Sequence, residues 1–177
     1  IDAMVHAIEA YTSKRLKNPL SDALARDALR LLGGNIHEVC RNGDNREARH
    51  NMLLGSMLAG MAFANAPVAA VHALAYPVGA RFHVPHGLSN SLVLPEVIRF
   101  NAPAAEHHYG ELAEILVPGA KGGSADRTKA LVEMLSALPT ELGLPTRLRD
   151  VGIAAKDIHA LADDAIKQTR LLINNPR

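Results

Sequence analysis

Four side chains in this sequence have the types and spacing of a metal-binding site: Asp2, His6, His72 and His86. Asp2 and His6 are four positions apart, so on a helix they project from one face, about 6 Å from each other. One carboxylate and three imidazoles suit a divalent transition metal such as iron(II) or zinc, and leave room for a substrate oxygen. The chemistry that this set could support is metal-assisted activation of a small molecule.

His72 and His86 can meet only if the chain turns between them. Fourteen residues of unbroken helix would hold them about 21 Å apart. Pro77 removes a backbone donor and clashes with the preceding turn, so we expect the chain to leave its helix after Tyr76 and turn back. Pro85 suits the first turn of a new helix, with His86 beside it. One histidine from each of two helices then faces a common point.

The elements that position these residues are predicted to be helices throughout. Apolar residues recur at helical spacing along most of the chain, and the apolar run within residues 45–64 predicts a helix that is buried on all sides. The fold class that we expect is all-α, a bundle of about seven or eight helices. The main helices are expected at residues 2–14, 21–32, 45–64, 68–76, 85–92, 103–116, 126–142 and 156–173.

Composition limits the function classes. The 177 residues are 48% hydrophobic and 21% charged, and the net charge of +1 gives no reason to expect nucleic acid or an anionic membrane as a partner. Cys40 is the single cysteine, so no internal disulfide can form and a cytoplasmic location is expected. The sequence shows no signal peptide and no apolar run long enough to span a bilayer.

Three motifs in order resemble those of the iron-containing (group III) alcohol dehydrogenase family: DAMVHAIEAY, NMLLGSMLAGMAFANA and VHALAYPVGARFHVPHGLSNSLVLPEVIRFN. The resemblance runs from residue 1 to about residue 101 and implies the dehydroquinate synthase-like α-domain of that family. It also implies that the four donors hold Fe(II), with zinc as an alternative. Family members carry an α/β domain that binds NAD or NADP before the first motif. Residues 1–177 contain no such domain, so we expect them to be the helical metal-binding domain of a longer enzyme.

The resemblance also directs attention to residues around the expected metal. Tyr76 stands where many family members have a second histidine, and it is either a pocket wall or a phenol that hydrogen-bonds to the substrate or cofactor. His83 lies in the expected loop and is either an exposed loop residue or a proton relay to solvent. Phe63 and Asn65 end the helix that precedes the His72 helix, and we expect them to line the cofactor pocket. The substitution at Tyr76 leaves the substrate class open.

The function predicted from the resemblance is an NAD(P)-dependent oxidoreductase that interconverts a small alcohol and its aldehyde or ketone by metal-assisted hydride transfer. The partners expected are this small molecule and further copies of the chain in a homo-oligomer. Two alternatives stay open. The enzyme could be a hydroxyacid–oxoacid transhydrogenase with a tightly held cofactor, or the chain could be a non-catalytic helical module. The chain alone is not expected to catalyse hydride transfer.

Overall fold

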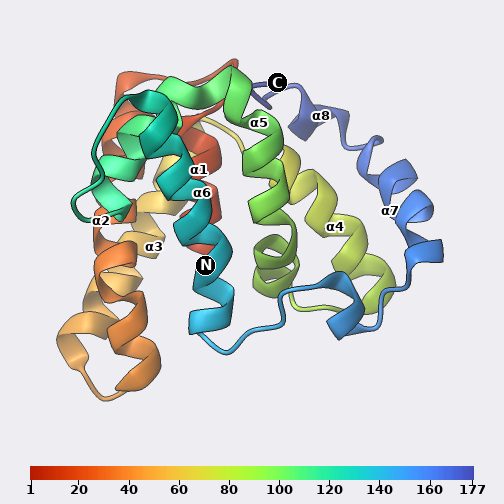
Figure 1. Ribbon diagram of the computed structural model, residues 1–177, viewed down its shortest axis with the longest axis horizontal. Coiled ribbons are helices and arrows are strands. Elements are labelled where there is room, and N and C mark those ends of the chain that lie inside the picture. Colours follow the sequence, from red (N-terminus) through yellow and green to blue (C-terminus); the bar gives the residue numbers. More distant parts are fainter.

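The computed structural model describes residues 1–177 and confirms the all-α prediction. Eight α-helices and two short 3₁₀ helices form the chain, with no β-strand (Figure 1). The α2–α3 pair lies at one end of the molecule, α4 and α7 lie at the other, and α5 and α6 pack together between them. The elements are α1 (Asp2–Tyr11), α2 (Pro19–Arg41), α3 (Arg46–Asn65), α4 (Ala70–Phe82), α5 (His86–Leu116), α6 (Ser124–Glu141), η1 (Leu148–Val151), η2 (Ala155–Asp157), α7 (Ile158–Ala165) and α8 (Thr169–Leu172).

Helix α1 is the centre of the core. It packs against α2, α3 and α5, and Met4, Val5 and Ile8 are at most 1% exposed. Such burial on several sides fixes both the position and the rotation of a helix, because each neighbouring helix constrains a different face. The donor residues that α1 carries are therefore held on a rigid element.

Helix α2 continues to Arg41, although the sequence predicted a helix only at residues 21–32. α2 begins with a capping box in which Asn18 accepts from the Ser21 N–H, while the Ser21 hydroxyl accepts from the Asn18 N–H. The helix then passes through Gly33 without a break. Gly33 lies close to α5, because a Cβ there would lie 2.6 Å from Cδ2 of Leu116. The contact with α3 is also close, because a Cβ at Gly55 of α3 would lie 2.9 Å from Cγ of Leu32.

The prediction that α3 is buried on all sides is wrong. Its buried residues are small, namely Ala48, Gly55, Ala59 and Ala62. Its large apolar residues Leu53, Met57 and Met61 are 74%, 54% and 47% exposed, and their spacing of four places them in one stripe. Small side chains let α3 approach its neighbours, so the apolar composition of the helix does not decide which face is inside.

No single helix is both long enough and apolar enough to be a candidate membrane span. Only α3 and α4, taken together as a sharply bent pair, meet these two criteria.

The turn between the two histidine-bearing helices comes later than predicted. Pro77 lies inside α4, where it is buried, and the helix continues to Phe82. Packing of α4 against α5 and α7 outweighs the loss of one backbone hydrogen bond at the proline. The reversal occurs at His83, the one non-glycine residue with positive φ (55°), and α5 begins at His86.

Two further boundaries differ from the sequence prediction. α5 extends to Leu116 and joins the two helices expected at 85–92 and 103–116, with non-helical backbone at Ala105. The single helix expected at residues 156–173 is instead divided into η2, α7 and α8. Residues 148–151, outside the expected helices, form the 3₁₀ helix η1.

The close α2–α3 contact generates a stability prediction. We expect Gly55→Ala to lower the free energy of unfolding by about 1–3 kcal/mol, because the added methyl group meets Leu32 in a packed interface. The matched control is Gly60→Ala on the same helix, where nothing lies within 4 Å of the new Cβ. That control should stabilise the chain by up to about 1 kcal/mol. Urea unfolding of both variants checks this, and equal effects would contradict it.

Candidate metal centre

The structure brings together the four donors that the sequence predicted. One ligand atom from each of Asp2, His6, His72 and His86 lies within 4.8 Å of the others. Asp2 and His6 come from α1, His72 from the first turn of α4, and His86 from the first residue of α5. Helix α1 thus converges with the consecutive helices α4 and α5, and the oxygen and three nitrogens fit a divalent transition metal.

His6 is held in a stack of rings. Its imidazole lies 4.4 Å from the Phe63 ring and 4.6 Å from the His72 ring, measured between centroids. Burial lowers the pKa of His6, and the neighbouring His72 lowers it further. Both effects favour the neutral imidazole, which is the form that binds a metal. Phe63, predicted to line the pocket, therefore forms a wall directly against one donor.

His72 is oriented by a buried carboxylate that the sequence analysis did not identify. Its Nδ1 lies 2.6 Å from Glu9 Oε2, and the other Glu9 oxygen accepts from the Val71 N–H at 2.7 Å. With Nδ1–H donating to the carboxylate, Nε2 keeps its lone pair toward the other donors. A carboxylate behind a metal-binding histidine fixes its tautomer and ring direction and raises its basicity.

His86 is the first residue of α5, and it reaches the other donors because α5 begins close to the start of α1. The left-handed turn at His83 and the N-cap at Pro85 direct α5 past the start of α1. Gly87 permits this, because a Cβ there would lie 3.3 Å from Asp2 Cβ. The His86 side chain is 48% exposed and that of His72 is 1% exposed. The site is therefore closed on the His72 side and open beside His86.

Asn90 is a second residue that the sequence analysis missed. It is fully buried, and its amide nitrogen donates to Asp2 Oδ1 at 2.5 Å. The same nitrogen lies 3.2 Å from His86 Nε2 and 3.4 Å from His72 Nε2. The amide thus contacts three of the four donors.

Helical spacing from predicted ligands was the one available signal for both residues. Glu9 follows His6 by three positions on α1, and Asn90 follows His86 by four on α5, so each shares a face with a donor. Many residues with no role at a site also lie three or four positions from a ligand. Spacing alone therefore does not identify Glu9 or Asn90 as part of the metal centre unless the neighbouring helix is known.

The remaining predicted site residues differ in their placement. The Tyr76 ring lies 6.1 Å from that of His72 and 5.9 Å from that of His86, so the phenol stands at the edge of the site.

His83 is exposed, and no hydrogen bond or ring contact joins it to the donors. Asn65 is also exposed and donates to the Met61 carbonyl of its own helix. Roles for His83 in catalysis and for Asn65 in cofactor binding stay predictions.

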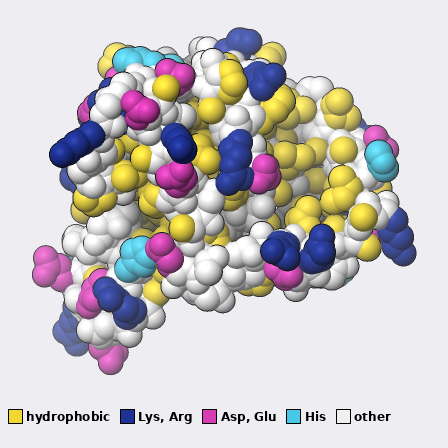
Figure 2. Space-filling view, in the orientation of Figure 1, with side chains coloured by type: hydrophobic (Ala, Val, Ile, Leu, Met, Phe, Trp, Pro, Cys, Tyr) yellow, Lys and Arg dark blue, Asp and Glu magenta, His cyan; other side chains and the backbone are white.

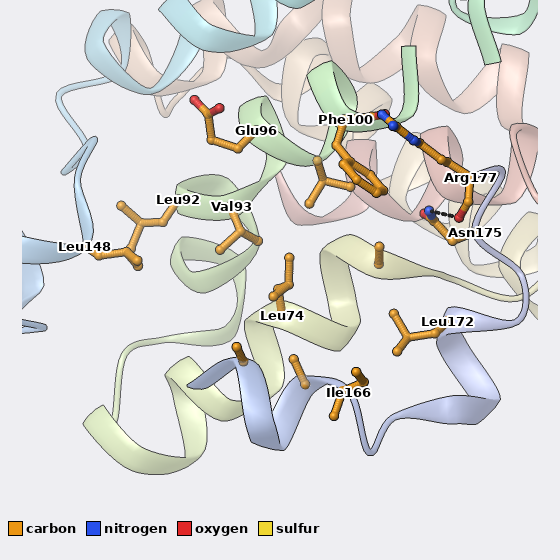
Figure 3. A pocket seen from close by; sticks show the side chains of 14 residues that line it. Leu74, Leu92, Val93, Glu96, Phe100, Leu148, Ile166, Leu172, Asn175 and Arg177 are labelled. Atoms are coloured by element: carbon orange, nitrogen blue, oxygen red, sulfur yellow. Dashed lines mark hydrogen bonds between the residues drawn. The ribbon is translucent and has the colours of Figure 1, made fainter. Parts of the chain in front are cut away.

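A large apolar cavity lies apart from this cluster. It has a volume of about 680 Å³ and is lined mainly by aliphatic residues, including Leu74 of α4 and Val93 of α5 (Figure 3). In the space-filling view of Figure 2, hydrophobic side chains gather in a hollow on the right of the molecule. Arg177 stacks over Phe100 at the cavity rim. No donor residue lines the cavity, so it is separate from the metal centre.

Comparison with known proteins identifies relatives along the whole chain. Residues 1–177 match the model of the Fe-containing alcohol dehydrogenase family, C-terminal. The chain is 38% identical over 178 residues to the 1,3-propanediol dehydrogenase of Klebsiella pneumoniae, covering 100% of this chain and 46% of that protein. It is 37% identical to the lactaldehyde reductase of Escherichia coli (strain K12), covering 94% of this chain and 43% of that protein.

A solved structure agrees with this result. A crystal structure of 1,3-propanediol oxidoreductase superposes with a TM-score of 0.95 at 37% identity, covering 99% of this chain and 46% of that one. The chain thus spans less than half the length of these relatives.

The Glu9–His72 contact generates a prediction about metal affinity. We expect Glu9→Gln to weaken Zn(II) binding about 10- to 100-fold, because an uncharged amide holds the His72 ring less firmly and lowers its basicity. Competition with a chromophoric chelator measures the dissociation constant. Glu133→Gln, at an exposed glutamate on α6, is the control and should leave the affinity unchanged. Equal affinities for the two variants would refute the assignment.

Proposed function

Because the chain belongs to the Fe-containing alcohol dehydrogenase family, we propose that it supplies the metal-binding half of the active site of an NAD(P)-dependent alcohol dehydrogenase. The observation that carries the proposal is the convergence of Asp2, His6, His72 and His86 within 4.8 Å. The intact donor set is unexpected for a non-catalytic helical module. Because the chain spans less than half the length of its relatives, binding of NAD or NADP is assigned mainly to an α/β domain outside it.

The four donors would hold Fe(II), with zinc as an alternative that the same donor set accepts. Such a metal supplies Lewis-acid chemistry, polarising the oxygen of an alcohol or carbonyl. Glu9 keeps the Nε2 lone pair of His72 directed into the site. The exposed side of His86 is where a substrate enters, and Phe63 covers one face of the His6 ring.

The substrate class that we propose is a small alcohol or its aldehyde or ketone. Relatives named 1,3-propanediol dehydrogenase and lactaldehyde reductase support this class. Tyr76 borders the open side of the site, between His72 and His86, and its phenol can hydrogen-bond to a substrate hydroxyl. A cytoplasmic location, consistent with the lone Cys40, and a homo-oligomeric assembly complete the proposal.

Metal content tests the proposed function first. After anaerobic incubation with Fe(II) and desalting, we expect about one iron per chain, because three imidazoles and a carboxylate form one complete donor set. His72→Ala and His86→Ala should each lose it. The control is His107→Ala, whose exposed imidazole pairs only with Glu111. Iron retained by His72→Ala would contradict the assignment.

A second test addresses Tyr76 in the complete enzyme that carries this chain. We expect Tyr76→Phe to lower kcat/KM for a small alcohol about 2- to 10-fold, which is what the loss of one hydrogen bond costs. Metal content should not change, because the phenol is not a donor. Tyr11→Phe is the control, since its hydroxyl donates to Glu111 away from the site. An unchanged kcat/KM would make Tyr76 a pocket wall.

A further inference from the structure

Two consecutive asparagines that follow α8 bind α5 and the segments beside α1 and α4, the three helices that carry the donors (Figure 1). The Asn174 carbonyl accepts from the Lys14 N–H at 2.8 Å, just beyond α1. The Asn174 Nδ2 donates to the Val68 carbonyl at 3.3 Å, just before α4. Asn175 exchanges two hydrogen bonds, at 2.9 and 2.7 Å, with the side-chain amide of Asn101 on α5. The two residues thus form an asparagine bridge between the three helices.

The asparagine bridge is buried. Asn174 and Asn175 are 4% and 5% exposed, and Asn101 is 3% exposed. A buried polar group that loses its partner is strongly unfavourable, because water does not take the partner's place. The amides therefore hold the segments that they join in one arrangement.

The contacts of Asn174 flank the Glu9–His72 pair along the chain. Lys14 follows Glu9 by five positions, and Val68 precedes His72 by four. Asn174 therefore ties the exit of α1 to the entry of α4, the two segments between which Glu9 holds His72. Movement of α4 away from α1 would lengthen the 2.6 Å contact between Glu9 Oε2 and His72 Nδ1, and the His72 ring would lose its fixed direction.

Helix α8 also supports the walls of the metal centre through apolar contacts. Leu171 of α8 forms a buried cluster with Val68 and Ala73. Phe63 and Tyr76 pack against the same cluster, and their rings lie beside the histidine donors. The segment that carries the asparagine bridge is therefore in contact with the surroundings of the site as well as with the donor-bearing helices.

We propose that the asparagine bridge positions His72 for metal binding, with Asn174 acting through the Glu9–His72 pair and Asn175 anchoring α5. This inference rests on the proposed function, because it takes the four donors as the metal site. Coupling between two sites is reciprocal, so a metal held by the donors also stabilises the docking of α8.

The test uses the complete enzyme that carries this chain. Asn174→Ala removes the donor to the Val68 carbonyl and keeps the backbone contact with Lys14. We expect it to weaken Zn(II) binding about 3- to 10-fold, because Asn174 reaches the donors only through the residues between them. Competition with a chromophoric chelator measures the dissociation constant. With Co(II) as a second probe, the visible absorption spectrum should shift, because it reports the arrangement of the donors.

The matched control is Thr128→Ala. The Thr128 hydroxyl also donates to a backbone carbonyl across a helix contact, that of Glu106 at 2.8 Å, and the residue is 5% exposed. It joins α6 to α5 away from the asparagine bridge, and α6 carries no donor. Thr128→Ala should lower the unfolding temperature and leave the Zn(II) affinity and the Co(II) spectrum unchanged.

A double variant tests the route of the effect. If Asn174 acts through Glu9, then adding Asn174→Ala to Glu9→Gln should weaken Zn(II) binding by less than about 2-fold beyond Glu9→Gln alone, because residues in one network are not additive.

The outcomes distinguish this inference from the function on which it rests. Weaker Zn(II) binding and a shifted Co(II) spectrum in Asn174→Ala but not in Thr128→Ala support the proposal. Equal Zn(II) affinities for these two variants overturn it, because Asn174 would then contribute only to stability. Full additivity with Glu9→Gln also overturns it. If Asn174→Ala does not fold, Asn174→Ser, which keeps a polar group there, takes its place. A parent enzyme that binds no Zn(II) overturns the proposed function, and this inference with it.

Discussion

The arrangement of this protein depends on the pairing of one buried carboxylate. Glu9 is 4% exposed, and its two oxygens accept from the Val71 N–H and from His72 Nδ1. A buried carboxylate without such partners would be strongly destabilising, so α1 and the start of α4 are held in a single relative position. That position directs His72 toward Asp2 and His6, and the core around α1 resists any rotation that would separate them.

The helical fold and the four donors could be predicted because their signals are local or shared with a known family. Asp2 and His6 lie on one face at a spacing of four, and the motifs around His72 and His86 resemble those of iron-containing alcohol dehydrogenases. The reversal between the two histidines was predicted too early. Pro77 is a breaker only where tertiary packing does not outweigh one lost hydrogen bond, and sequence does not reveal that packing.

Other features could not be predicted, because they depend on which helices are neighbours. The inward face of α3 is decided by Gly55 and Ala59, which let α2 and α1 approach, and not by the larger Leu53 and Met57. Glu9 and Asn90 acquire their roles from partners 63 and 88 positions away. A glutamate in an amphipathic helix normally indicates a solvated face, and nothing local distinguishes this one.

The sequence distances across the metal centre have a consequence for how the chain folds. The contacts at Glu9 and Asn90 close chain segments of 62 and 88 residues, and each closure costs conformational entropy that short helical contacts do not. Contacts of this kind slow folding, because the entropy of loop closure is lost before the contact stabilises the chain. In the unfolded chain the two donors of α1 are far from those of α4 and α5, so the complete set of four exists only in the folded chain. Occupancy of the site is thus a readout of completed tertiary assembly.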